Sequence, residues 1–421
     1  MWDKNKTREL ADQLVSWRRM FHSNPEVSNE EKETSIAVYD ALKSMGIEIQ
    51  QFKGHFGLCG VIKGKYPGPV VALRTDMDAL PITEANDVPY RSKRAGVMHA
   101  CAHDAHMAIM LGVARMFSSC CGEFAGTIKL LFQPAEEAAP LGGAGLLIKD
   151  GVLDGVDVIF GLHLWPDLSC GHIGIRQGAL MAASDRLTIK ILGQAAHAGQ
   201  PQYGVDAITI AADVIHGLGH IMNRQIDPLE TATISIGSIQ GGERYNVIAK
   251  EVSLAGTVRT LGETVRKEIP LRIKRLLDGV TAAQGGNYIL DYQYGYPVLM
   301  NWVEPTQIII NAAKQVVGDE VVDSNVKPVL AAEDFGNYLA NTPGAFFWLG
   351  CAKAGETNYH LHSSNFDIDE NALLIGTQIM HKAVLMALEH YDRPGELEDR
   401  IKPVSKNRPS SGSPVVTIKR E

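Results

Sequence analysis

The sequence PVVALR at residues 69–74 is a short apolar run of the kind that forms a buried strand. Similar runs occur at residues 127–132 (TIKLLF) and 156–160 (VDVIF), and a helical stretch at residues 103–118 separates the first two runs. Strands that alternate with helices favour a mostly parallel sheet with helices on both of its faces. The fold class predicted for this part of the chain is therefore α/β.

Candidate functional side chains come directly after these strands. Asp76 and Asp78 follow the first strand, Glu136 and Glu137 follow the second, and His163 lies at the end of the third. In sheets of this kind, ligands bind beyond the carboxyl ends of the strands. The order of the residues therefore predicts an active-site rim at that edge of the sheet.

The segment MHACAHDAH at residues 98–106 combines a cysteine with three histidines. Thiolate, imidazole and carboxylate are the groups that bind zinc and similar divalent metals. Cys101 and His103 point the same way only on an extended segment or loop, which fits a loop leading into the helix at residues 103–118. An isolated Cys-x-His is more often a buried thiol beside a helix start, so the metal interpretation depends on the combination of motifs.

Each remaining candidate also has a structural explanation. Paired glutamates such as Glu136 and Glu137 are usually solvated, and a histidine that ends an apolar strand, such as His163, is usually a core residue. His362 repeats the i, i+2 histidine spacing with His360. His197 lies among small residues that would let a ligand approach closely, or it is simply a turn residue.

From about residue 184 the pattern changes to that of a smaller domain. The order of expected elements is βαββαβ, which is typical of a ferredoxin-like unit. Its strands are expected at residues 186–192, 231–239, 251–258 and 288–292, and its helices at residues 205–221 and 263–283. The predicted organisation is a catalytic domain in two parts (1–183 and 298–402), an inserted domain (184–297) and a flexible tail (403–421).

Composition excludes several classes of function. The net charge of -8 argues against a general attraction to nucleic acid or to an anionic membrane, so neither is an expected partner. No apolar run approaches the roughly 20 residues of a membrane-spanning helix, and a cytoplasmic location is the default expectation. The six cysteines have no framework spacing and are expected to be free thiols. A thiol redox function of Cys101, or of the pair Cys120 and Cys121, is a weaker alternative.

Taken together, the motifs resemble those of the di-metal amidohydrolase and exopeptidase family that contains aminoacylases, carboxypeptidases and succinyl-diaminopimelate desuccinylase. The chain is most similar to the branch of hippurate hydrolase and indole-3-acetyl-amino acid hydrolases. The resemblance runs nearly end to end. It is carried by RRMFH (18–22), NPE (24–26), LRTDMDALP (73–81), QPAEE (133–137), GGERYNVI (241–248), GTVRT (256–260) and DIDE (367–370).

The resemblance implies two divalent metal ions per subunit, either zinc or manganese, with cobalt or nickel as further candidates. The implied ligands are Cys101, which would bridge the two metals, His103, Glu137, His163 and His362. Glu136 would be the general base, and Asp78 would support the metal ligands. The implied fold is a zinc-exopeptidase-like α/β domain.

The inserted domain resembles the lid and dimerisation domain of this family. The resemblance implies a homodimer or tetramer, in which His197 reaches the site of the partner subunit and stabilises the oxyanion. Asn246 and Arg259 would contact the substrate. The family usually has Cys-Gly-His-Asp-Gly-His where this chain has Ala102 and Ala105 in place of the glycines. If these positions need a positive φ, each alanine costs about 1 kcal/mol.

The expected reaction is metal-dependent hydrolysis of the amide bond of an N-acyl or N-aroyl amino acid. A water activated by the metals would attack the carbonyl while Glu136 accepts its proton. A dipeptidase or carboxypeptidase that uses the same site is the nearest alternative. A non-catalytic metal-binding homologue is a further alternative, although the retained ligands and Glu136 argue against it.

Overall fold

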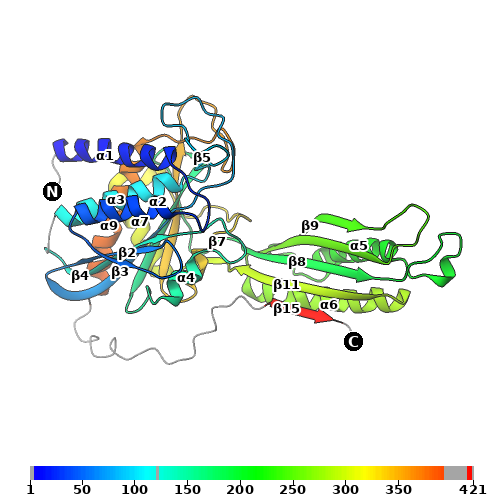
Figure 1. Cartoon of the computed structure of the whole chain (residues 1–421). Helices are drawn as coiled ribbons and strands as arrows, with labels where there is room; N and C mark the ends of the chain where they lie inside the picture. Colours follow the sequence, from blue (N-terminus) through cyan, green and yellow to red (C-terminus); the bar gives the residue numbers. More distant parts are fainter. Residues whose placement is uncertain (1–3, 120–122, 393–414, 420–421) are drawn as a thin grey trace. The chain divides into compact units, whose positions relative to one another are not determined.

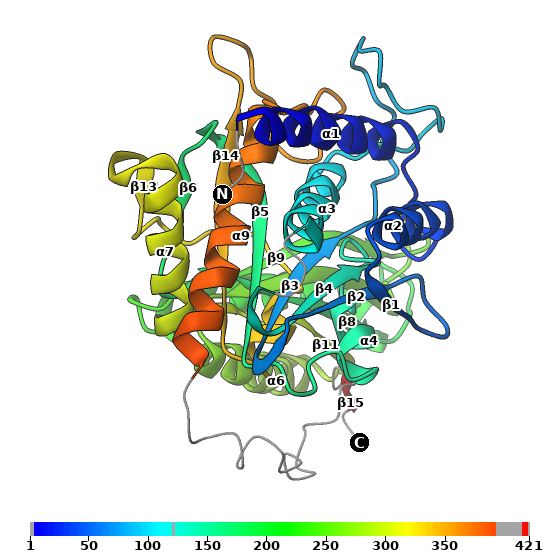
Figure 2. The same cartoon turned by 90° about the vertical axis from the view of Figure 1, so that its left-hand side faces the viewer.

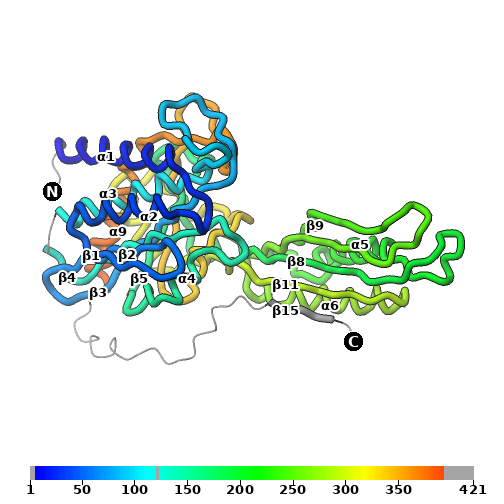
Figure 3. Tube along the Cα trace, viewed as in Figure 1, coloured from blue at the N-terminus to red at the C-terminus, as the bar shows by residue number. Residues whose placement is uncertain are grey.

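The computed structural model describes residues 4–119, 123–392 and 415–419, and the chain forms two compact units. The first unit contains the described residues of Met1–Leu180, Met300–Lys327 and Asp334–Pro409. The second contains those of Met181–Leu299, Pro328–Glu333 and Ser410–Glu421, so the expected insertion at residues 184–297 falls within it. The course of the chain through these segments can be followed in Figure 3.

The first unit is built on an eight-stranded mixed sheet with the order β1-β2-β4-β3-β5-β14-β6-β13 (Figure 1). Strand β3 is parallel to both β4 and β5, and β5 is parallel to β14. The predicted apolar runs overlap β3, β4 and β5, which confirms the α/β prediction. The strands are β1 (Glu48–Gln51), β2 (Leu58–Lys63), β3 (Tyr66–Asp76), β4 (Ala125–Gln133), β5 (Val158–Ser169), β6 (Ile173–Gly174), β13 (Val322–Asp323) and β14 (Gly344–Ala352).

The helices of the first unit pack on this sheet and on one another. Helix α3 packs against α1, α9 and β3, and α9 also packs against α7 and β14 (Figure 2). The helices are α1 (Lys4–Ser23), α2 (Lys32–Ser44), α3 (His103–Ser119), α4 (Ala144–Lys149), α7 (Val303–Val317), α8 (Gly336–Leu339) and α9 (Asn371–Tyr391). Two further strands, β7 (Gly178–Met181) and β12 (Leu299–Asn301), form a separate two-stranded sheet.

Helix α9 is an exception to the expectation that no segment is apolar enough to cross a membrane. Within the described part of the chain, it is the one helix that meets the criteria of length and composition. Several of its apolar side chains, among them Ile379 and Val384, are fully buried in the core of the first unit. Helices at the centre of a soluble core meet the same criteria.

The second unit has a five-stranded antiparallel sheet with the order β15-β11-β8-β10-β9. Helices α5 and α6 pack against each other and on the sheet. Without β15, the chain order is βαββαβ, as predicted. The elements are β8 (Ala183–Leu192), a 3-10 turn (Pro201–Tyr203), α5 (Ala207–Arg224), β9 (Ala232–Gly241), β10 (Glu251–Thr260), α6 (Glu263–Gln284), β11 (Asn287–Tyr296) and β15 (Val415–Lys419).

Strand β15 corrects part of the tail prediction. Residues Val415–Lys419 were expected in a flexible extension, but they pair with β11 in an antiparallel ladder. Their backbone groups hydrogen bond to the edge of the sheet, which would otherwise present unpaired N–H and C=O groups. Residues 403–414 and 420–421 of the predicted tail lie outside the described residues, as do Cys120 and Cys121.

Candidate metal centre and active site

The five predicted metal ligands come together in the first unit as two groups. Ligand atoms of Cys101, His103 and His163 lie within 4.8 Å of one another, and so do those of Cys101, Glu137 and His362. Cys101 belongs to both groups, which is the arrangement that a bridging thiolate requires. Its loop leads into α3, and the other ligands come from the start of α3, the loop after β4, strand β5 and the loop after β14.

The imidazole of His103 is oriented for metal binding. Its Nδ1 lies 2.8 Å from the carbonyl oxygen of Asp78, so Nδ1 carries the proton and donates it. Its Nε2 is buried and has no hydrogen-bond partner among the described residues. Burial lowers the pKa of His103, but the negative charges of Asp76 and Asp78 outweigh that effect and raise it to about 10. The position therefore favours a cation, either a proton or a metal ion.

His163 is held in a similar way by the backbone. Its Nδ1 donates to the carbonyl oxygen of Leu164 at 2.7 Å, and its Nε2 lies 3.4 Å from Sγ of Cys101. Burial holds the pKa of His163 well below its usual value, which keeps the ring neutral and makes its Nε2 an acceptor. His106 supports this arrangement, because its Nε2 accepts from the amide of Leu164 at 3.0 Å and its Nδ1 donates to Asp76 at 2.8 Å.

Asp78 contacts both the Glu136–Glu137 segment and His103. Its carboxylate accepts hydrogen bonds from the backbone amides of Glu136, at 3.1 Å, and Glu137, at 2.9 Å. It also accepts from the hydroxyl of Ser28 at 2.6 Å and lies 3.3 Å from Nδ1 of His103. Burial alone would raise the pKa of Asp78, but these hydrogen bonds lower it by more. The pKa therefore lies below its usual value, and the carboxylate stays charged. Asp78 therefore contacts both the segment that carries Glu136 and Glu137 and the ring of His103.

The carboxylate of Glu136 faces the same cluster. Oxygen atoms of Glu136 and Glu137 and a ring nitrogen of His103 lie within 4.8 Å of one another. Glu136 is buried, with 7% of its surface exposed. Glu137 Oε1 lies 3.1 Å from Nε2 of His362, yet it has no hydrogen-bond partner among the described residues. A cation between these groups would satisfy both, so the donor set fits the implied metals.

Strained backbone positions concentrate around these residues. In the described part of the chain, the non-glycine residues with positive φ are Asn29 (66°), Ala102 (64°), Ala135 (56°) and His362 (66°). Ala102 lies between two predicted ligands, Ala135 precedes Glu136, and His362 is itself a predicted ligand. Such conformations cost free energy and cluster at functional sites. Of the two alanines that replace family glycines, Ala102 has the positive φ, whereas Ala105 is an ordinary residue of α3.

The other three predicted residues lie in the second unit. His197 is exposed, and its Nδ1 accepts from the amide of Gly199 at 3.0 Å. The amide of Ala198 donates to the carbonyl oxygen of Asn246 at 3.1 Å, which brings His197 and Asn246 together. The side-chain Oδ1 of Asn246 is buried without a hydrogen-bond partner among the described residues. Arg259 lies apart from them on β10, and burial lowers its pKa.

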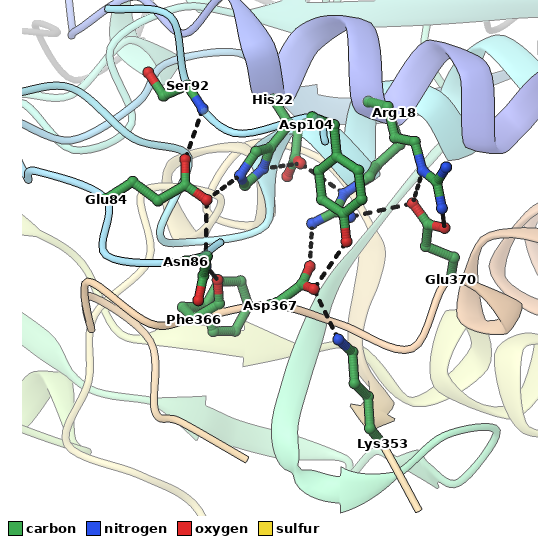
Figure 4. A network of polar contacts seen from close by, with 12 residues as sticks. Arg18, His22, Glu84, Asn86, Ser92, Asp104, Lys353, Phe366, Asp367 and Glu370 are labelled. Carbon is green, nitrogen blue, oxygen red and sulfur yellow. Dashed lines mark hydrogen bonds and ion pairs between the residues drawn. The ribbon is translucent and has the colours of Figure 1, made fainter. Parts of the chain in front are cut away.

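A buried ionic network that was not predicted holds two ligand-bearing segments against α1 (Figure 4). Arg18 donates to Asp104 at 2.9 Å and to Asp367 at 2.6 Å, and His22 lies 2.8 Å from Asp104. Asp104 follows the predicted ligand His103, and Asp367 comes five residues after His362. The i, i+4 spacing of Arg18 and His22 places both side chains on one face of α1, but it does not indicate their partner.

Comparisons with known proteins identify the family of the chain. A profile of the family described as "Peptidase family M20/M25/M40" matches residues 72–386. The N-acyl-L-amino acid amidohydrolase of Geobacillus stearothermophilus is 43% identical over 302 residues, which cover 72% of this chain and 81% of that protein. Thermostable carboxypeptidase 2 of Saccharolobus solfataricus is 37% identical over 376 residues, covering 89% of this chain and 95% of that protein.

A solved structure extends the likeness to three dimensions. The YXEP protein of Bacillus subtilis, described as a dinuclear metal-binding peptidase of the M20 family, is 33% identical. It superimposes with a TM-score of 0.79, covering 91% of this chain and 99% of that one. The chain therefore belongs to peptidase family M20/M25/M40 and is an amide-hydrolysing enzyme.

Proposed function

We propose that this enzyme hydrolyses the amide bond of N-acyl or N-aroyl amino acids and releases a carboxylic acid and a free amino acid. The observation that carries the proposal is the pair of ligand groups that share Cys101, with the buried Glu136 beside them. The relative named N-acyl-L-amino acid amidohydrolase supports the choice of substrate class.

The ligand set suits two divalent ions, zinc or manganese, with cobalt and nickel as further candidates. Cys101, His103 and His163 would hold one ion, and Cys101, Glu137 and His362 the other. When bound, the ions supply Lewis acidity, which polarises the amide carbonyl and lowers the pKa of water.

Glu136 is the proton carrier of the proposed reaction. Its backbone amide is held by Asp78, which anchors its carboxylate beside Glu137. Glu136 accepts a proton from the attacking water as the new C–O bond forms. It then gives this proton to the leaving nitrogen as the C–N bond breaks, so the products are a carboxylic acid and an amine.

Residues of the second unit would complete the site. Because the amide of Gly199 donates to Nδ1 of His197, that nitrogen is an acceptor, and in the neutral ring Nε2 carries the hydrogen. A free N–H donor of this kind is suited to stabilise a developing oxyanion. The unpaired Oδ1 of Asn246 and the guanidinium of Arg259 are proposed to bind the amide group and the carboxylate of the substrate.

We further propose that the second unit mediates a homodimer, with a tetramer as the alternative, so that His197 serves the partner's site. Strand β9 supports this, because among the described strands it pairs only with β10. Its Ile239 is exposed, which suits an interface with a second copy.

A carboxypeptidase or dipeptidase activity of the same site is the second candidate, favoured by the likeness to thermostable carboxypeptidase 2. The two candidates differ in the substrate amine. An amidohydrolase of this kind acts on a blocked α-amino group, whereas a dipeptidase requires a free one.

The test is amino-acid release from a panel of N-acetyl, N-benzoyl and longer N-acyl amino acids and matched dipeptides. The protein is stripped of metal and reloaded separately with zinc and manganese, and Glu136→Gln serves as the blank. Metal-dependent release from the acylated set supports the proposal, and Glu136→Gln should bind metal but lose activity by several orders of magnitude. Release from dipeptides alone supports the second candidate, and no release with either metal contradicts both.

A further inference from the structure

The backbone amides of three consecutive residues, Ala135, Glu136 and Glu137, all donate to buried carboxylates. Ala135 donates to Oε1 of Glu31 at 2.8 Å, Glu136 donates to Oδ1 of Asp78 at 3.1 Å, and Glu137 donates to Oδ2 of Asp78 at 2.9 Å. Ala135 has a φ of 56°. Successive N–H groups around such a left-handed residue form a concave binding site for anions.

Glu31 is the one member of this arrangement that is not among the predicted site residues or their immediate neighbours. It lies directly before α2 and is fully buried. Its Oε1 also accepts from the amide of Asn29 at 2.9 Å, so one oxygen contacts two residues in the left-handed region, Asn29 and Ala135. Its Oε2 is buried without a hydrogen-bond partner among the described residues. An unpaired buried oxygen destabilises the fold, so packing alone does not explain a glutamate here.

We propose that Glu31 is a positioning residue that holds Ala135 in its left-handed conformation and thereby aims Glu136 and Glu137 at the metal site. The inference rests on the proposed function, because it concerns the proposed base and one of the proposed ligands. Asp78 alone does not fix the loop, since it binds only the two amides that follow Ala135.

The two ligand groups allow a selective test. Glu137 belongs to the group with Cys101 and His362, whereas the group of Cys101, His103 and His163 contains no residue of the loop. Loss of the Glu31 contact should therefore weaken binding of one metal ion and leave the other nearly unchanged. A general loss of stability would affect both.

The experiment titrates zinc into the metal-free full-length chain by calorimetry. For Glu31→Ala we expect one binding step to weaken about 10–100-fold, as is usual when a partner of a metal ligand is removed. Glu31→Gln keeps a carbonyl oxygen for the amide of Ala135 and should restore that step. Hydrogen exchange of the Ala135 amide, measured without metal, should be faster in Glu31→Ala than in Glu31→Gln.

The matched control is Glu26→Ala. Glu26 is also buried, and its side chain accepts from the amide of Thr34 in the first turn of α2 at 2.7 Å, but among the described residues it makes no hydrogen bond to the loop. The substitution Glu26→Ala should lower thermal stability without selectively weakening one of the two zinc-binding steps. If Glu31→Ala does not fold, Glu31→Asp is tested in its place. The aspartate side chain is one methylene group shorter, which moves the carboxylate away from Ala135.

Equal weakening of both steps in Glu31→Ala, an unchanged titration, or the same selective loss in Glu26→Ala would overturn the inference. A two-step titration with a selective loss, but no hydrolysis by the unmodified enzyme, would support Glu31 and contradict the proposed function. Failure of the unmodified protein to bind zinc would overturn both.

Discussion

The buried Nε2 of His103 lies 3.7 Å from the carboxylate of Asp76 and makes no hydrogen bond to a described residue. The charge of Asp76, which also pairs with Arg74 at 2.8 Å, thus acts on the ring nitrogen that would bind a metal ion. In the metal-free protein a proton on His103 takes that place, because nearby carboxylates outweigh burial and raise its pKa to about 10. Burial, together with Glu137 and Glu136, also raises the pKa of Cys101 well above its usual value.

Zinc binding at neutral pH should therefore release a proton from His103 and another from Cys101. His163 releases none, because its pKa is lowered. The raised pKa of His103 means that its proton is fully bound below pH 6.5 and is lost only near pH 10, so zinc affinity should rise with pH across this range. Calorimetry in buffers with different ionisation enthalpies counts the protons. Zinc binding to the His103→Gln variant should release one proton fewer. Zinc binding to the unmodified protein without proton release would contradict the assignment of protons to His103 and Cys101.

Ala102 and Ala105 allow a matched test of backbone strain. Both are fully buried, and Ala→Gly removes the same methyl group at each position. Ala102→Gly also relieves a left-handed conformation, worth roughly 1–2 kcal/mol, whereas Ala105→Gly weakens a helix by about 1 kcal/mol. We expect the free energy of unfolding of Ala102→Gly to exceed that of Ala105→Gly by at least about 1 kcal/mol. Denaturant unfolding of the metal-free variants measures it, and equal values would argue against the strain.

The fold was predictable where local pattern and burial agree. The apolar runs at residues 69–74, 127–132 and 156–160 overlap β3, β4 and β5, because central strands of a mostly parallel sheet are buried on both faces. Strand β15 was missed because it follows a polar stretch of the sequence and because its partner, β11, is distant along the chain. Short edge strands such as β13 carry too few residues to show a period.

The sequence predicted a set of candidate ligands but not the contacts that support them. The resemblance supplied Cys101 and its partners, and the two groups that share this residue agree with it. The residues that orient them were missed, because Arg18 meets Asp104 across 86 positions and Glu31 meets Ala135 across 104. Charged residues at such separations give no local pattern, and only the folded chain shows that they are buried.

Arg18 should contribute much more to stability than its neighbour Arg19. Arg18 is buried and donates to Asp104, Asp367 and Glu370, so Arg18→Ala leaves buried negative charge uncompensated (Figure 4). Breaking a buried ion pair in this way costs about 3–5 kcal/mol. The side chain of Arg19 is 46% exposed and pairs with Glu370, so Arg19→Ala should cost less than about 1 kcal/mol. Denaturant unfolding compares the two, and similar losses would contradict a stabilising role of the network.

Arg259 provides a test of how the substrate carboxylate is recognised. Its half-buried guanidinium makes no hydrogen bond or ion pair within the described residues, and burial lowers its pKa by more than the negative charge of Asp185 raises it. A desolvated, unpaired cation gains from binding an anion, so Arg259→Gln should raise KM for N-acyl amino acids about 10–100-fold, as loss of a charged hydrogen bond does. The exposed Arg186 on β8 is the matched control, and Arg186→Gln should leave KM unchanged.

Substrate analogues make this prediction specific to the carboxylate. An N-acyl amino acid amide lacks the negative charge, so the unmodified enzyme should bind it as weakly as Arg259→Gln binds the acid. The variant itself should no longer discriminate between the two substrates, because the discriminating cation is gone. Steady-state kinetics on the acid and amide pair measures both effects. If Arg259→Gln still prefers the acid by the full margin of the unmodified enzyme, the carboxylate is bound by another residue.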